Sequence, residues 1–234
     1  MLRIKDLHKR FGKLEILKGI SYDIEKPGIY AVLGPNGSGK TTLLKSILGM
    51  VIPNSGSIIY DGDEVQGNWQ YRSKIGYLPQ IARFPDNLTV NELIAMIKNL
   101  RDEEADEKSL IERFELGRHL NNKLGALSGG TRQKVNLVLT FMFDCPLYIL
   151  DEPTAGLDPV SLIRLKDMIR DEREKGKTFL ITTHIIDLVD ELANEIIFLL
   201  EGKVYFRGTV RELEHQTQEK DLEHAIANLL VEHV

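Results

Sequence analysis

The chain has 234 residues, of which 42% are hydrophobic and 28% charged, and its formal net charge is −5. This balance predicts a folded protein of one or two domains and excludes collagen-like and low-complexity chains. The slight negative charge argues against a nucleic-acid binder that works through bulk positive charge. One cysteine, Cys145, excludes an internal disulfide, and its apolar surroundings favour a buried side chain over a nucleophile.

Neither a signal peptide nor a membrane span is predicted. The first twelve residues contain charges throughout, and no uncharged run, Val135 to Phe143 included, reaches the roughly 20 apolar residues that a span needs. We therefore expect a cytoplasmic chain.

The first part of the chain has the patterns of a β-rich domain. Strands are predicted at 2–7, 20–25, 28–33, 56–63 and 74–78. The strand at 28–33 is apolar throughout, as in a parallel sheet buried on both faces. It leads into a Gly-rich loop at 34–39 and a helix over 40–48 that Gly49 ends.

From residue 89 the pattern becomes helical. Helices are predicted behind a capping box at 89–92, around Ile111, Phe114 and Leu116, and from near Ser128 to Phe143. This stretch interrupts a β/α pattern, which indicates a helical subdomain inserted into an α/β core.

The β/α alternation then resumes. Strands are predicted at 147–150, 178–183, 196–200 and 204–206, with helices at 159–175 and 187–193. The expected divisions are an N-terminal core part at 1–88, a helical subdomain at 89–146, a C-terminal core part at 147–210 and a helical tail at 211–234.

The Gly-rich loop fits the phosphate-loop pattern of Gly, four residues and Gly-Lys-Thr. The residues expected to bind phosphate are Gly34, Pro35, Asn36, Gly37, Ser38, Gly39, Lys40, Thr41 and Thr42. The glycines let backbone N–H groups point inward, and the following helix adds its positive end. Lys40 would reach the outer phosphates, and the Thr41 hydroxyl would bind Mg²⁺.

Two carboxylates end the apolar strand 147–150. Asp151 would bind Mg²⁺, and Glu152 could act as general base towards an attacking water. Alone, a strand that ends in Asp-Glu is mostly a surface feature, but beside a phosphate loop it is the expected partner.

A second anion site is possible at the start of the helix near residue 128. Ser128 fits an N-cap, and Gly129 and Gly130 expose backbone N–H groups. Without context, an ordinary helix start is the simpler interpretation.

Together these motifs resemble the ABC ATPases over about residues 2 to 210. GPNGSGKTT, Gln80 after a strand, LSGGT, LYILDE, the segment 155–158 and His184 after FLITT occur in that family's order. The resemblance implies an α/β fold: a phosphate-loop NTPase (RecA-like) core with an antiparallel β subdomain and an inserted all-helical signature subdomain. It also implies ATP and Mg²⁺ as cofactors.

The resemblance assigns roles to individual residues. Gln80 would contact Mg²⁺ and the attacking water, and His184 the γ-phosphate; a lone histidine would otherwise be a structural one. Phe11 would stack on adenine, unless it is a packing aromatic. Asp158 would contact the other subunit of a dimer, or cap the helix that starts at Pro159, or both.

The signature segment is expected to serve the partner's ATP in a head-to-tail dimer. Its residues are Ser128, Gly129, Gly130 and Thr131. Thr131 departs from the family's usual glutamine; phosphate contact should survive, while the hydrolysis rate or the subfamily could differ.

The leading functional interpretation is the ATP-hydrolysing subunit of an ABC transporter, on the cytoplasmic face of the membrane. It would drive membrane-spanning permease subunits on separate chains and form an ATP-dependent homodimer, or a heterodimer with a related subunit. A finer resemblance, in GYLPQIARFPDNLTV and LSGGTRQK, is to ATPases that mature the copper site of nitrous oxide reductase.

Other classes of protein fit less well. A non-transport ABC ATPase acting on nucleic acid or ribosomes would need a long coiled coil, or two ATPase domains with basic linkers. A GTPase would need Asn-Lys-x-Asp, but Gly125 follows Asn122-Lys123-Leu124.

Overall fold

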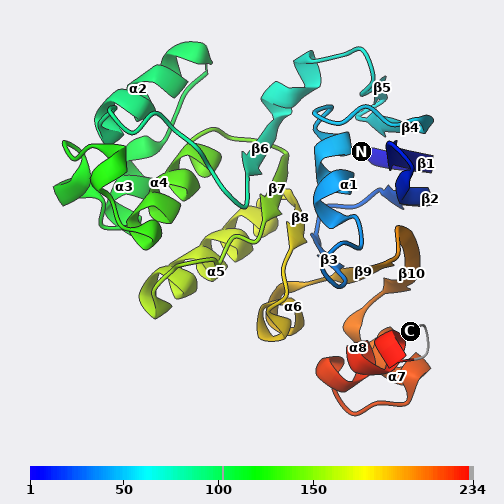
Figure 1. The fold of residues 1–234 in the computed structure, drawn as a ribbon. Coiled ribbons are helices and arrows are strands. Elements are labelled where there is room, and N and C mark those ends of the chain that lie inside the picture. Colours follow the sequence, from blue (N-terminus) through cyan, green and yellow to red (C-terminus); the bar gives the residue numbers. More distant parts are fainter. Residues whose placement is uncertain (102, 232–234) are drawn as a thin grey trace. The chain divides into compact units, whose positions relative to one another are not determined.

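The computed structural model describes residues 1–101 and 103–231 (Figure 1). The chain forms two compact units: residues 1–72 with 178–234, and residues 73–177. The predicted helical subdomain, 89–146, lies inside the second unit together with strands and a helix that flank it. The predicted tail runs to residue 234, and its last three residues lie outside the described part.

The first unit contains the larger share of the strands. They are β1 Leu2–Phe11, β2 Leu14–Ile24, β3 Ile29–Leu33, β4 Ser55–Tyr60, β5 Asp63–Glu64, β8 Thr178–Thr182, β9 Glu195–Leu200 and β10 Lys203–Gly208. An antiparallel sheet has the order β2-β1-β4-β5. In the other sheet, β3 lies between β8 and β9 and is parallel to both, and β10 pairs antiparallel with β9. The expected antiparallel β subdomain and parallel core are therefore present.

The helices of the first unit cover its parallel strands and extend the core. They are α1 Lys40–Ile47, α6 Ile186–Leu192, α7 Val210–Thr217 and α8 Leu222–Val231. A 3₁₀ turn, Gln70–Lys74, continues the chain towards the second unit. Leu213 of α7 and Leu229 of α8 belong to one buried cluster with Phe198 of β9. The C-terminal helices are thus part of the core of this unit, because their apolar faces cover the outer end of its sheet.

The second unit combines a parallel strand pair with helices. Its elements are β6 Ile75–Leu78, α2 Val90–Leu100, α3 Glu107–Arg113, α4 Gly129–Phe141, β7 Leu147–Asp151 and α5 Pro159–Glu174, with 3₁₀ turns at Gly117–His119 and Leu124–Ala126. The predicted capping box starts α2: the Glu92 N–H donates to Thr89 Oγ1 over 3.2 Å, and Glu92 Oε2 accepts from the Thr89 N–H over 2.7 Å. None of the helices within the described ranges combines the length and apolar character that crossing a bilayer requires.

Some elements differ from the prediction for local reasons. The first hairpin is longer than its alternating pattern indicates, because Asp6 adopts φ 46° in an irregular stretch of β1 and breaks the alternation. The helix around Ile111 ends at Arg113, and Glu115 then has φ 54°. Phe114 and Leu116 are nevertheless fully buried. These two residues are therefore apolar because they belong to the core, and not because they continue the apolar face of a helix.

Candidate functional site

The phosphate loop lies between β3 and α1 and packs closely against neighbouring backbone. Gly34 has φ 142°, and a Cβ there would lie 2.0 Å from the Leu199 carbonyl oxygen of β9. Gly39 has φ 105°, and a Cβ there would lie 3.0 Å from the Ile16 carbonyl oxygen of β2. Both positions therefore require glycine, for conformation and for space.

The polar groups of the loop have few partners outside it. Lys40 Nζ donates to the carbonyl oxygens of Gly34, at 2.7 Å, and Pro35, at 3.1 Å, so its ammonium group lies across the loop. No side chain caps the start of α1 at Gly39, which leaves the positive end of the helix for a ligand. The side chain of Ser38 is buried, and within the described residues its Oγ has no hydrogen-bond partner.

His184 lies at the same edge of the sheet as the phosphate loop. β3 and β8 are parallel, with Val32 opposite Thr182, so the segments that follow them leave the sheet side by side. The phosphate loop follows β3 and exposed His184 follows β8. The first unit therefore brings together two sequence-predicted parts of the site.

Phe11, at the end of β1, is an exposed aromatic. Its side chain is 53% exposed, and Lys9 Nζ lies 4.8 Å from the ring centroid. A half-exposed ring with a cation over it fits stacking better than packing in the core. Its role towards adenine stays a prediction.

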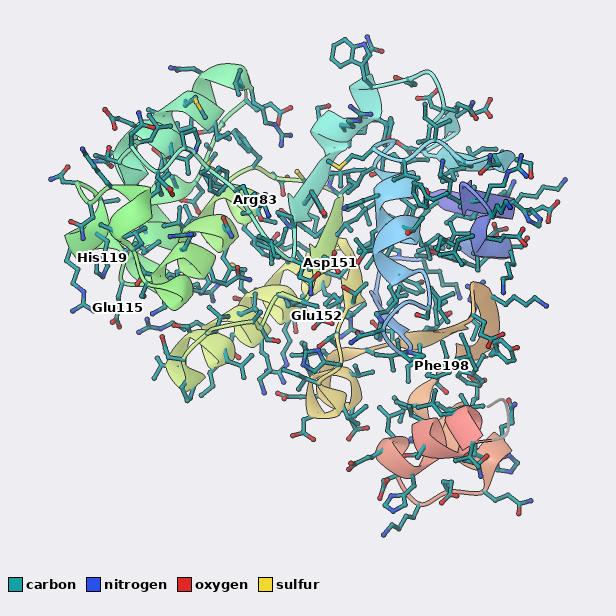
Figure 2. The ribbon with its side chains drawn as sticks, viewed as in Figure 1. Arg83, Glu115, His119, Asp151, Glu152 and Phe198 are labelled. Atoms are coloured by element: carbon teal, nitrogen blue, oxygen red, sulfur yellow. The ribbon has the colours of Figure 1, made fainter. Side chains whose placement is uncertain are left out.

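In the second unit, the ends of β6 and β7 bring together Gln80, Asp151 and Glu152. The strands are parallel, with Leu78 opposite Leu150, and Gln80 follows β6 by two residues while Asp151 ends β7. Figure 2 shows Asp151 and Glu152 next to each other at this strand end. Asp151 is 3% exposed. Burial, and after it the Asp151 charge, raises the pKa of Tyr77 to about 12.

Glu152 has an unusual backbone conformation. Its φ is 52°, in the left-handed region, which costs a side chain with a Cβ about 1–2 kcal/mol. The next residue is Pro153, and residues before proline prefer extended backbone, so two preferences are overridden here. Such strain persists where surrounding contacts hold it, and it occurs frequently at functional sites.

The signature segment starts α4, as predicted. Ser128 Oγ accepts from the Thr131 N–H over 3.2 Å, which makes Ser128 the N-cap. The Thr131 hydroxyl lies 2.9 Å from Ser128 Oγ, so the departure at this position adds a local hydrogen bond. A Cβ on Gly130 would lie 2.6 Å from the Gly156 carbonyl oxygen, so this residue must be glycine.

Asp158 caps α5 and also bonds α4. Asp158 Oδ1 accepts from the Ser161 N–H over 2.9 Å, and Oδ2 lies 2.7 Å from Lys134 Nζ. The hydrogen bond from Lys134, followed by those from Ser161, holds the pKa of Asp158 well below its usual range. The N-cap interpretation is thus confirmed, and contact with a second subunit stays a prediction.

Sequence reasoning did not single out Gln133 and Lys134 of α4. The available signal was the spacing of Gln133, Asn136 and Thr140, which places three polar residues on one helical face. Gln133 Nε2 donates to the Pro153 carbonyl oxygen over 3.0 Å, directly beyond Glu152.

The sequence profile described as "ABC transporter" matches residues 17–155, more than half of the chain. The chain belongs to the ABC transporter family. Its relatives include the lantibiotic transport ATP-binding protein SrtF of Streptococcus pyogenes, 34% identical over 87% of this chain and 89% of that protein. Another is the Bacillus subtilis ABC-type transporter ATP-binding protein EcsA, 32% identical over 94% of this chain and 92% of EcsA.

Solved ABC cassettes share the fold. The ATP-binding subunit of an ABC transporter superposes with a TM-score of 0.92 at 28% identity, over 98% of this chain and 99% of that one. The dimeric cassette MJ0796, in a post-hydrolysis state bound to ADP and Pi, has a TM-score of 0.79 at 26% identity, over 89% of this chain and 98% of that one. The expected α/β phosphate-loop fold is therefore confirmed. So is the expected class of activity, an ABC ATPase that couples ATP hydrolysis to transport.

Proposed function

We propose that this ABC cassette powers an exporter whose membrane-spanning subunits are separate chains. Among its relatives are a lantibiotic transport protein and a Nod factor export protein of Burkholderia lata, 32% identical over 89% of this chain and 71% of that protein. The proposal that the cassette hydrolyses ATP is supported by the carboxylate pair at the end of β7, where buried Asp151 is followed by Glu152 with its strained backbone. The finer resemblance to copper-site maturation ATPases stays a prediction.

The first unit would bind the nucleotide. The orphan hydroxyl of Ser38, the Lys40 ammonium group and the start of α1 fit phosphate oxygens, and the exposed Phe11 ring fits adenine. His184, which follows the strand beside the loop, would donate to the γ-phosphate.

Mg²⁺ fits the chemistry of the proposed donors. By the resemblance, the Thr41 hydroxyl, the Gln80 amide and the Asp151 carboxylate would each offer an oxygen ligand, and one carboxylate with phosphates and waters is the usual Mg²⁺ environment. When bound, the ion would neutralise charge on the phosphates. Glu152 would accept the proton of the attacking water, and Gln80 would orient that water.

The second unit would also serve a partner subunit. Ser128, Gly129, Gly130 and Thr131 would offer the N-terminus of α4 to ATP held by the other cassette of a homodimer or heterodimer. Asp158, half exposed at its cap, would face the same partner. ATP would thus close the dimer, and hydrolysis would reopen it.

A groove beyond Gln80 is the proposed contact with the permease, which would place the cassette on the cytoplasmic face of the membrane. This cavity of about 330 Å³ is lined by Ile81, Ala82, Arg83, Phe84, Asp86, Leu124 and Arg132. Ile81 is 70% exposed there, and it directly follows Gln80, the residue proposed to contact Mg²⁺ and the attacking water. A short cytoplasmic helix of the permease is the expected occupant.

The decisive experiment is Glu152→Gln. This variant should bind ATP with wild-type affinity, lose turnover and accumulate as an ATP-bound dimer on size-exclusion chromatography. Glu115→Gln is a matched control, because Glu115 is also a glutamate at positive φ in the same unit but bonds Arg164 (Figure 2). Normal turnover in Glu152→Gln would remove Glu152 as the base. Stimulation by DNA or ribosomes, and by no co-encoded membrane protein, would favour the non-transport alternative.

A further inference from the structure

Helix α4 buries polar side chains along the face by which it packs. Gln133, Asn136 and Thr140 are 7%, 5% and 5% exposed, and their spacing of three and four residues places them on one face. Apolar side chains at these positions would be the simpler way to pack the helix, because a buried polar group costs free energy unless it is bonded.

The bonds of these side chains lead to two segments of the proposed site. Gln133 Nε2 donates to the Pro153 carbonyl oxygen over 3.0 Å. Asn136 Nδ2 donates to Gln133 Oε1 over 3.4 Å, which holds the Gln133 amide with its nitrogen towards Pro153. Thr140 Oγ1 lies 2.8 Å from the Asn136 carbonyl oxygen of its own helix and 3.2 Å from the Tyr77 carbonyl oxygen, in the strand that leads to Gln80, and its one proton is shared between them.

The bond to Pro153 acts at the strained point of the chain. Glu152 has φ 52° directly before a proline, and both facts oppose its conformation. The hydrogen bond from Gln133 holds the carbonyl oxygen of the residue that directly follows Glu152. Without it, Glu152 could relax towards an extended conformation and carry its carboxylate away.

We propose that Gln133 is a positioning residue that holds the Glu152 backbone in its catalytic conformation from the signature helix. The inference rests on the proposed role of Glu152 as general base. Because α4 also begins at Ser128, the segment offered to the partner's ATP and the residue that orients this chain's own base lie on one rigid helix.

The test is Gln133→Met in the 234-residue chain, which keeps the volume and removes both the donor to Pro153 and the acceptor for Asn136. We expect kcat for ATP hydrolysis to fall about 10-fold, with the Kd for ATP unchanged. The matched control is Tyr148→Phe in the same unit, since the Tyr148 hydroxyl, like the Gln133 amide, donates one buried hydrogen bond and accepts another. It donates to the Phe143 carbonyl oxygen over 3.0 Å and accepts from the Cys145 N–H over 3.3 Å. Tyr148→Phe should lower Tm by a similar amount and leave kcat unchanged.

A second comparison separates positioning from a general loss of structure. In single-turnover measurements, Gln133→Met should slow hydrolysis when it is introduced into the wild-type chain. When it is introduced into Glu152→Gln, it should cause no further loss, since both substitutions act through the same carboxylate. Wild-type kcat in Gln133→Met, a matching loss in Tyr148→Phe, or a full additional loss in the double variant would each overturn the inference.

Two further outcomes are distinguishable. If Gln133→Met does not fold, Gln133→Glu is tested in its place, because it keeps the shape and the acceptor for Asn136. If neither variant folds, the role of Gln133 is structural and the proposal fails. Normal turnover in Glu152→Gln would refute the proposed base itself. Loss of turnover in Glu152→Gln with a normal rate in Gln133→Met would refute only the positioning role.

Discussion

The buried hydroxyl of Ser38 leads to a prediction with opposite signs in two assays. Ser38 is 3% exposed, and its Oγ has no hydrogen-bond partner in the described part of the chain. The substitution Ser38→Ala removes this group and leaves almost the same shape. The nucleotide-free protein should become more stable, whereas ATP should bind more weakly, because in the proposed site the hydroxyl would donate to a phosphate oxygen.

The magnitudes follow from the cost of an unpaired polar group. A buried donor without a partner costs about 1–3 kcal/mol, so its removal should raise the free energy of unfolding by about 1 kcal/mol. For a chain of this length that corresponds to a rise in Tm of about 2–4 °C. A hydrogen bond to a charged group contributes about 1.5–3 kcal/mol, so its loss should raise the Kd for ATP on the order of 10- to 100-fold.

Differential scanning calorimetry without nucleotide and isothermal titration with ATP measure the two effects. The matched control is Ser46→Ala in α1, where a fully buried serine donates from Oγ to the Thr42 carbonyl oxygen over 2.8 Å. This control loses a satisfied bond, so it should not raise Tm, and its affinity for ATP should be unchanged.

The reasoning fails if Ser38→Ala lowers the Tm of the nucleotide-free protein. It also fails if the Kd for ATP is unaffected, because the hydroxyl would then serve neither the fold nor the ligand. An equal loss of ATP affinity in Ser46→Ala would show that any small change in this region weakens binding.

Other predictions concern adenine, charge and the C-terminal helices. Phe11→Ala should raise the Kd for ATP by about 5- to 100-fold, since aromatic stacking contributes about 1–3 kcal/mol per base, and Phe11→Trp should retain affinity. Asp158→Asn keeps a good N-cap but loses the ion pair with Lys134. At pH 7 it should cost at most about 1 kcal/mol, because the carboxylate is half exposed. Since the pKa of Asp158 is lowered in the folded chain, its stabilisation is present at neutral pH and declines as the pH falls below about 4, and thermal unfolding across pH measures this. Leu213→Ala, at a fully buried position of α7, should cost about 2–5 kcal/mol in denaturant unfolding.

Each of these has an informative opposite result. Unchanged ATP affinity in Phe11→Ala would leave the exposed ring without a role in nucleotide binding. A constant difference between Asp158→Asn and the wild type from pH 7 to pH 3 would contradict the charge argument. Exposed Gln216 of α7 supplies the control for Leu213, since Gln216→Ala should be nearly neutral. A neutral Leu213→Ala would mean that α7 does not stabilise the unit.

The parts of the site that sequence reasoning found are those whose chemistry is local. A phosphate loop needs glycines, a lysine and a hydroxyl at fixed spacing. This motif can be recognised from consecutive residues, without knowledge of which other segments pack against them. The Thr89 and Ser128 caps are similarly local, because an N-cap bonds residues two or three positions ahead. Gln133 was not found, because its importance depends on Pro153, 20 residues away in the chain.

The sequence by itself determined the strand, loop and helix of the phosphate site, the carboxylate pair after β7, and the family to which the chain belongs. Tertiary structure alone decided that Phe11 is exposed, that α7 and α8 complete a core, and that Glu152 has a left-handed backbone held from α4. The physical reason is the range of the interactions. Turn and cap chemistry acts within a few residues, whereas burial and strain are set by segments that meet only when the chain has folded.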